Sequence, residues 1–99
     1  MKLKEENIKS VALYGATDTA RSFLHYLINN EISITCILDD EYSKEYDKFF
    51  EFPVISSENV SSYTFDAIVI TTVVFQDEFK FKINQSFGSK YKVLSLFER

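Results

Sequence analysis

The chain is poor in the residues that build cross-linked or metal-bound domains. Its 99 residues include one cysteine, Cys36, and one histidine, His25. A single cysteine excludes an internal disulfide and a zinc site built from several thiolates. Because Cys36 lies inside an apolar strand pattern, we expect it to be a small, buried core residue.

Long apolar runs are also absent. No stretch approaches the roughly 18 apolar residues that are needed to cross a bilayer. The first residues, MKLKEENIKS, are charged where a signal peptide would have an apolar core. We therefore expect a cytoplasmic protein that does not insert into membranes.

Positive charge is scarce and scattered. The chain has 11 Lys and Arg residues against 15 Asp and Glu residues, which gives a net charge of −4. Such a chain repels a polyanion on average, so DNA and RNA are not expected partners. The sequence also lacks a Ser-His-Asp or Cys-His pattern, paired catalytic carboxylates and a Walker loop. We see no catalytic constellation in it.

What the sequence does contain is a regular alternation of strand-like and helical segments. The hydrophobic fraction of 45% predicts one packed domain over residues 1–99. Apolar and β-branched runs typical of buried parallel strands cover 11–14, 32–38, 66–72 and 91–96. Pro53 limits 50–55 to a short or edge strand, because proline cannot donate to a ladder. Helical patterns cover 18–28 and 75–87, and a shorter helix is predicted from Ser56 or Ser57 to Tyr63.

This alternation predicts an α/β fold of three layers. We expect a mostly parallel sheet of about four to five strands, joined by right-handed crossovers. The strand at 11–14 should lie near the middle, between 32–38 and 66–72. A ligand would then bind at the carboxyl ends of the strands, between Gly15-Ala16 and Thr71-Thr72.

The first predicted helix carries signals at both ends. Either Thr17 or Asp18 can cap its first turn. Asn29-Asn30 should end it, because Asn tolerates a left-handed backbone. Its apolar face is expected to consist of Ala20, Phe23, Leu24, Leu27 and Ile28. In the last helix, Phe75, Phe79, Ile83 and Phe87 form a stripe that ends at Gly88.

The turn before the first helix keeps only part of the dinucleotide-binding fingerprint, G-x-G-x-x-G. The chain reads Gly15-Ala16-Thr17-Asp18-Thr19-Ala20 there. Gly15 permits the tight turn and Ala20 permits close packing of helix on strand. Thr17, however, places a Cβ where a pyrophosphate would approach, and Asp18 adds a negative charge. The turn therefore either binds an anion or joins strand to helix without a ligand.

Other polar residues are predicted at the same edge of the sheet. Asp39-Asp40 follows the second strand at about the spacing, roughly 20 residues past the glycine turn, at which an acid binds a ribose diol. Acids at strand ends also cap loops and face water. Ser56-Ser57 and Thr71 could hydrogen-bond a ligand, or could simply cap a helix and end a strand.

Three further residue types have simpler explanations. Adjacent acids such as Asp39, Asp40 and Glu41 point in different directions on an extended chain, so no metal site is expected. His25 lies on the outward side of its helix without an acid partner in the sequence, so we expect it to face solvent. Arg21 could reach a phosphate at the helix start or pair with a surface acid.

These motifs together resemble a known group of domains. The segments are IKSVALYGATDTARSFLHYL, ITCILDD, PVIS, DAIVITT and KVLSLF. They are similar to the compact Rossmann-like domains attached to bacterial glycan-pathway enzymes. Such domains include the nucleotide-sugar-binding N-terminal domains of sugar acyltransferases and the CoA-binding-like domains beside sugar-nucleotide dehydratases.

The resemblance implies a non-catalytic accessory domain in bacterial glycan or small-molecule modification. Its ligand would be a nucleotide, a nucleotide-sugar or a CoA-like molecule. The turn residues Gly15, Ala16 and Thr17 and the acids Asp39 and Asp40 would hold it. The relatives usually have glycine where this chain has Thr17, which implies a degraded site. A larger glycan-pathway enzyme is the partner that the resemblance implies.

An alternative is a structural module without a ligand, which associates with itself as a homodimer or docks on a partner enzyme. The chain has 10 phenylalanines, more than a small core needs. The candidates for such a contact are Phe49, Phe50, Phe52 and Phe81. An enzyme acting alone is less expected, because a dinucleotide-dependent catalyst usually adds a substrate domain.

Overall fold

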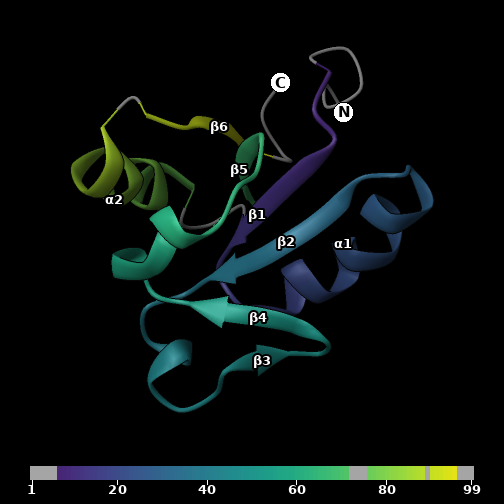
Figure 1. The fold of residues 1–99 in the computed structure, drawn as a ribbon, viewed down its shortest axis with the longest axis horizontal. Coiled ribbons are helices and arrows are strands. Elements are labelled where there is room, and N and C mark those ends of the chain that lie inside the picture. Colours follow the sequence, from purple (N-terminus) through teal and green to yellow (C-terminus); the bar gives the residue numbers. More distant parts are fainter. Residues whose placement is uncertain (1–6, 72–75, 89, 96–99) are drawn as a thin grey trace.

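The computed structural model describes residues 7–71, 76–88 and 90–95, which form a single sheet with helices packed on it (Figure 1). The strands are β1 (Ser10–Tyr14), β2 (Ser33–Leu38), β3 (Lys48–Phe49), β4 (Phe52–Ile55), β5 (Ala67–Ile70) and β6 (Lys92–Ser95). The helices are α1 (Asp18–Asn29) and α2 (Gln76–Phe87), with short 3-10 helices at Tyr42–Lys44 and Ser57–Ser62.

The sheet has six strands in the order β3-β4-β2-β1-β5-β6. All neighbouring pairs are parallel except β3 and β4. The predicted α/β class, the mostly parallel sheet and the central position of the first strand are thus confirmed. The sheet exceeds the expected four to five strands, because the chain reverses at Phe50-Glu51 and adds β3 to the edge. The strand with Pro53 is short, as predicted, and pairs with β2 only through Val54 and Ile55.

Two apolar cores lie on opposite faces of the sheet, which confirms the three layers. Leu24 and Leu27 of α1 pack with Val11 and Leu13 on one face. Ile83 of α2 packs on the other face, in a cluster that includes Ala12, Cys36 and Leu38. The half-buried Phe79 and Phe87 pack against the same cluster, so the predicted stripe of α2 is confirmed for the described residues. Phe75 lies outside the described residues.

One irregularity in β2 decides which side chains reach which core. Val11 pairs with Ile34 and Ala12 pairs with Cys36, so Thr35 is an extra residue without a partner in β1. Such a bulge shifts the alternation of the strand by one position. As a result, Ile34 belongs to the core beneath α1, whereas Cys36 belongs to the core beneath α2.

The ends of α1 agree only partly with the sequence prediction. Thr17 is the N-cap, and its Oγ1 accepts a hydrogen bond from the amide of Ala20 at 3.1 Å. The left-handed residue is Glu31, with φ of 62°, and not Asn30, which has φ of −97°. Asn30 instead stays near the helical turn, because its amide and its Nδ2 both donate to the carbonyl of Tyr26.

Two other local predictions are corrected. Ile28, expected on the apolar face of α1, is 52% exposed, because the sheet contacts a narrower stripe that contains Ala20, Leu24 and Leu27. The helix predicted from Ser56 or Ser57 is a 3-10 helix, and its N-cap Ser56 makes no side-chain capping bond. Gly88 ends α2 as predicted, with φ of 60°.

Within the described ranges, neither α-helix has the length and apolarity that a membrane span requires.

Candidate functional site

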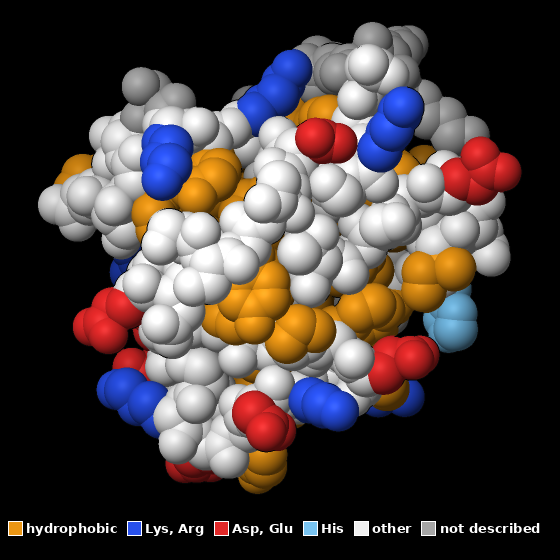
Figure 2. Space-filling view, in the orientation of Figure 1, with side chains coloured by type: hydrophobic (Ala, Val, Ile, Leu, Met, Phe, Trp, Pro, Cys, Tyr) orange, Lys and Arg blue, Asp and Glu red, His pale blue; other side chains and the backbone are white. Residues whose placement is uncertain are grey.

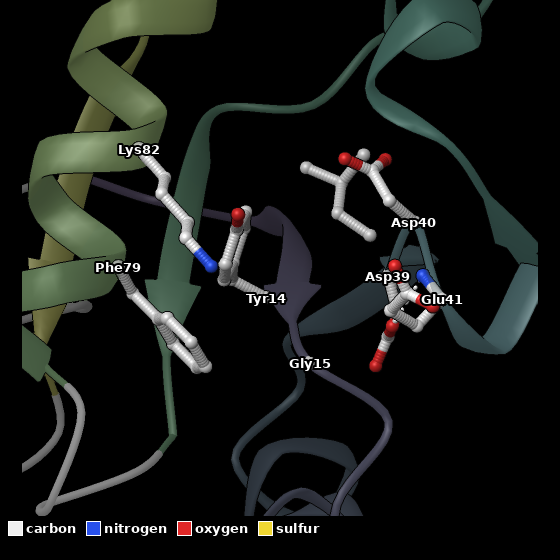
Figure 3. A pocket seen from close by; sticks show the side chains of 8 residues that line it. Tyr14, Gly15, Asp39, Asp40, Glu41, Phe79 and Lys82 are labelled. Atoms are coloured by element: carbon white, nitrogen blue, oxygen red, sulfur yellow. Dashed lines mark hydrogen bonds between the residues drawn. The ribbon is translucent and has the colours of Figure 1, made fainter.

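A cavity of about 320 Å³ lies at the carboxyl ends of β1 and β2, the edge where the sequence predicted a ligand (Figure 3). Its lining consists of Tyr14, Gly15, Leu38, Asp39, Asp40, Glu41, Phe79 and Lys82. Phe79 and Lys82 extend from α2 on one side, while the acids follow β2 on the other (Figure 3). Gly15, Asp39 and Asp40 are therefore brought together at one place, as the topology of parallel strands requires.

Gly15 forms the tight turn between β1 and α1 at this edge of the sheet. Its φ of 101° is a conformation that other residues rarely adopt. Its amide donates to the carbonyl of Leu38 at 2.8 Å, which fixes the end of β1 against the end of β2. A Cβ at this position would meet only ordinary contacts, at 3.5 Å from Thr17 and 3.7 Å from Phe79. The glycine is therefore required by the backbone conformation and not by lack of space.

The carboxylate of Asp39 is engaged inside the protein. Its Oδ2 accepts from the amide of Ala16 at 2.8 Å. Its Oδ1 accepts from the amides of Glu41 at 3.1 Å and Tyr42 at 3.0 Å. The residue predicted to bind a ribose thus joins the glycine turn to the loop after β2. Its Oδ2 also accepts the hydrogen bond of the Ala16 amide, which was predicted to be available to an anionic ligand.

The rest of the predicted turn is more open. The amide of Ala20 is capped by Thr17, but the amides of Asp18 and Thr19 donate to no residue in the described part of the chain. Asp18 is exposed and its carboxylate takes no hydrogen bond from the turn among those residues. Two amides at the start of α1 therefore remain available, with the helix dipole behind them and the charge of Asp18 beside them.

Asp40 holds the other side of the edge. Its Oδ1 accepts from the amide of Ser57 at 2.7 Å, and its Oδ2 accepts from the hydroxyl of Ser57 at 3.2 Å. Two residues that the sequence placed at one sheet edge are thus in direct contact. The bond fixes the Ser57–Ser62 helix against the end of β2, and the exposed carboxylate keeps lone pairs for further donors.

Five lining residues were not among the ligand-binding residues predicted from the sequence: Tyr14, Leu38, Glu41, Phe79 and Lys82. The rings of Tyr14 and Phe79 meet edge to face, with centroids 4.9 Å apart. Lys82 Nζ lies 6.0 Å from the Phe79 ring centre and 3.7 Å from Glu78. Burial raises the pKa of Tyr14, and the charges of Asp40 and Asp39 raise it further. Tyr14 could have been predicted from the sequence, because it directly precedes Gly15. Phe79 and Lys82 could not, because they reach the cavity only through the packing of α2 against the sheet.

The remaining sequence candidates lie elsewhere. Thr71 is fully buried after β5, and its Oγ1 has no hydrogen-bond partner among the residues that the structure describes, but it does not line this cavity. Thr72 lies outside the described residues. Arg21 and His25 are on the exposed face of α1, where Arg21 lies 5.8 Å from the ring centre of Phe50. Cys36 is buried as predicted, and burial raises the pKa of its thiol to about 12. Among the described residues, no group of His, Cys, Asp and Glu is arranged to hold a metal ion.

Comparison with known families assigns most of the chain to one family. The model of the family described as C2185-like, N-terminal, matches residues 7–94. The chain belongs to this family. The match covers β1 to β5, both α-helices and β6 as far as Leu94, so the site described above lies within the family's domain. No curated protein matches the chain.

Proposed function

We propose that the chain is a non-catalytic accessory domain that binds a nucleotide-type ligand in the cavity beside Gly15. The observation that supports this best is the cavity itself, which combines two aromatic rings, one lysine and carboxylates at the carboxyl edge of the central strands. Its volume of about 320 Å³ is of the size of small-molecule sites. The resemblance to glycan-pathway domains supports a setting in bacterial glycan or small-molecule modification.

Each part of a nucleotide-type ligand has a suitable partner at this edge. The rings of Tyr14 and Phe79 offer an apolar surface to a base. Asp40 and Glu41 can accept hydrogen bonds from ribose or sugar hydroxyls. Lys82, on the side of the cavity formed by α2, offers a cation to a phosphate that lies away from the turn.

The same contacts support the description of the site as degraded. The Asp39 carboxylate accepts the hydrogen bond from the Ala16 amide that a pyrophosphate would otherwise accept, and it places a negative charge at that position. Thr17 keeps its side chain where the fingerprint has glycine. The site therefore favours ligands that are held by base and hydroxyl groups and that carry little phosphate charge at the turn.

The test is a ligand screen on the whole chain. NAD, a UDP-sugar, CoA and ATP are added separately at millimolar concentration, and the melting temperature is followed by circular dichroism. A ligand present at 100 times its dissociation constant stabilises the folded state by about 2.7 kcal/mol. For a domain of this size, that corresponds to a rise of roughly 10 °C or more.

The ligand that raises the melting temperature is then titrated against two lysine variants. Lys82→Met should weaken binding by about tenfold, the effect of losing one hydrogen bond to a charged group. Lys48→Met is the matched control, because Lys48 is exposed on β3 and does not line the cavity. The proposal is overturned if none of the four compounds stabilises the chain, or if both substitutions weaken binding equally.

A further inference from the structure

A second hollowed surface lies away from the ligand cavity, between α1, the start of β2 and the β3–β4 hairpin. Because β4 pairs with β2 only at the carboxyl end, the hairpin and the first half of β2 diverge (Figure 1). Two hollows of about 400 and 470 Å³ occupy this opening, and they share Ile28, Glu51 and Phe52. We call this surface the α1–hairpin groove. Figure 2 shows hydrophobic side chains gathered across the middle of the corresponding face.

Two large apolar residues of the groove are exposed to solvent. Ile28 is 52% exposed and Phe50 is 59% exposed. Phe50 also has φ of 57° at the tip of a two-residue hairpin turn, where glycine or asparagine would be favoured. Phe50 therefore carries two separate free-energy costs, the backbone strain of its positive φ and the exposure of its ring to water. A surface that covers the ring would remove the cost of exposing it to water.

The charges of the groove differ between its two ends. Arg21 and His25 line the hollow beside Phe50. Glu31 lines the other hollow, whose floor includes the buried Ile32 and Ile34. Ile28, Glu51 and Phe52 lie between these ends, since they line both hollows. The groove therefore has Arg21 and the protruding ring of Phe50 at one end, Glu31 and an apolar recess at the other, and the carboxylate of Glu51 between them.

We propose that this groove binds the same groove of a second copy of the chain, related by a two-fold axis near Ile28. A two-fold axis brings each end of one surface against the opposite end of its copy. Arg21 of each copy would then face Glu31 of the other. Phe50 of each copy would enter the recess beside Ile32 and Ile34 of the other. Among the occupants of an apolar groove, a second copy is favoured because Arg21 and Glu31 carry opposite charges at the two ends, and the exposed ring of Phe50 lies at the end opposite to the apolar recess.

The first experiment compares two equally exposed phenylalanines by sedimentation of the chain over a range of concentrations. The wild type should form a dimer. Phe50→Asn should weaken it about 30-fold or more, as loss of an aromatic anchor does, and asparagine suits the left-handed backbone of the turn. Phe81→Asn should change dimerisation less than twofold; Phe81 is 61% exposed, but it lies on α2 and does not line the groove.

The second experiment tests the two-fold pairing through charge. Arg21→Glu and Glu31→Arg should each weaken the homodimer, because each places like charges opposite one another at both ends. An equal mixture of the two variants should form a heterodimer about as stable as the wild type, because both ends then pair opposite charges.

Several results would overturn the proposal. One is a wild type that stays monomeric at millimolar concentration, and another is an assembly larger than a dimer. Equal effects of Phe50→Asn and Phe81→Asn would place the contact elsewhere. Failure of the two charge variants to associate with one another would exclude the two-fold arrangement. None of these measurements involves the ligand cavity, so the proposed function and this inference can fail independently.

Discussion

The carboxylate of Asp39 should be the most important polar side chain for the stability of this domain. Two contributions can be separated. Its bonds to the amides of Glu41 and Tyr42 cap the Tyr42–Lys44 helix from outside, and loss of such a cap costs about 1 kcal/mol. Its bond to Ala16 is a charged hydrogen bond in a half-buried position, which contributes about 1.5–3 kcal/mol. Asp39→Ala should therefore lower the free energy of unfolding by about 3 kcal/mol.

Urea denaturation followed by circular dichroism measures this loss. With a denaturant slope of about 1–3 kcal/mol per molar, the midpoint should fall by roughly 1–3 M. Asp40→Ala is the matched control, because Asp40 is the neighbouring acid but is exposed, and within the described part of the chain its carboxylate accepts hydrogen bonds from Ser57 alone. Its loss should be about 1 kcal/mol. A loss below about 1 kcal/mol for Asp39→Ala, or equal losses for the two variants, would refute this reasoning.

Three further predictions follow from single residues. With a thiol pKa of about 12, Cys36 should resist a thiol reagent at pH 8 until the chain is unfolded; reaction of the native chain at the rate of a free thiol would contradict its burial. The amides of Lys9 and Ser10 lower the pKa of Asp66 below 3.8, so this carboxylate stabilises the fold above that pH and the contribution is lost as pH falls through the lower, folded-state value. Asp66→Asn should accordingly flatten the loss of stability seen on acidification below pH 3.8 in thermal melts, and an unchanged acid profile would count against it. Phe50→Asn should raise the unfolding free energy of the dilute monomer by about 1 kcal/mol, through relief of backbone strain; a lower melting temperature would show that the ring is needed by the hairpin itself.

The elements and their order could be predicted because they depend on local patterns. Short apolar runs separated by an amphipathic helix leave few arrangements other than a parallel sheet with crossovers. Central placement of 11–14 follows from the same rule, and so does the meeting of Gly15 with Asp39-Asp40 at one edge.

The departures arise where a distant contact decides a local choice. From the sequence, the Asp39 side chain could either bind a ligand or cap a loop. Only the folded chain shows that the amide of Ala16 lies within hydrogen-bonding distance of it. Ile28 fits an apolar helical stripe, yet in the folded chain it borders the hollow beside the β3–β4 hairpin and stays 52% exposed. The reversal at Phe50 uses an unusual residue for a tight turn, so no turn signal marked β3.

The extra residue in β2 has a consequence for how this strand can vary. Upstream of Thr35 the even-numbered position 34 points toward α1, and downstream of it the odd-numbered position 37 does so. Deleting Thr35 would remove the extra residue and leave Ile34, Cys36, Ile37 and Leu38 in regular alternation, each still facing its present layer. Deletion of Thr35 should therefore be tolerated better than insertion of one further residue in 33–38, which would turn the side chains beyond it to the opposite layer.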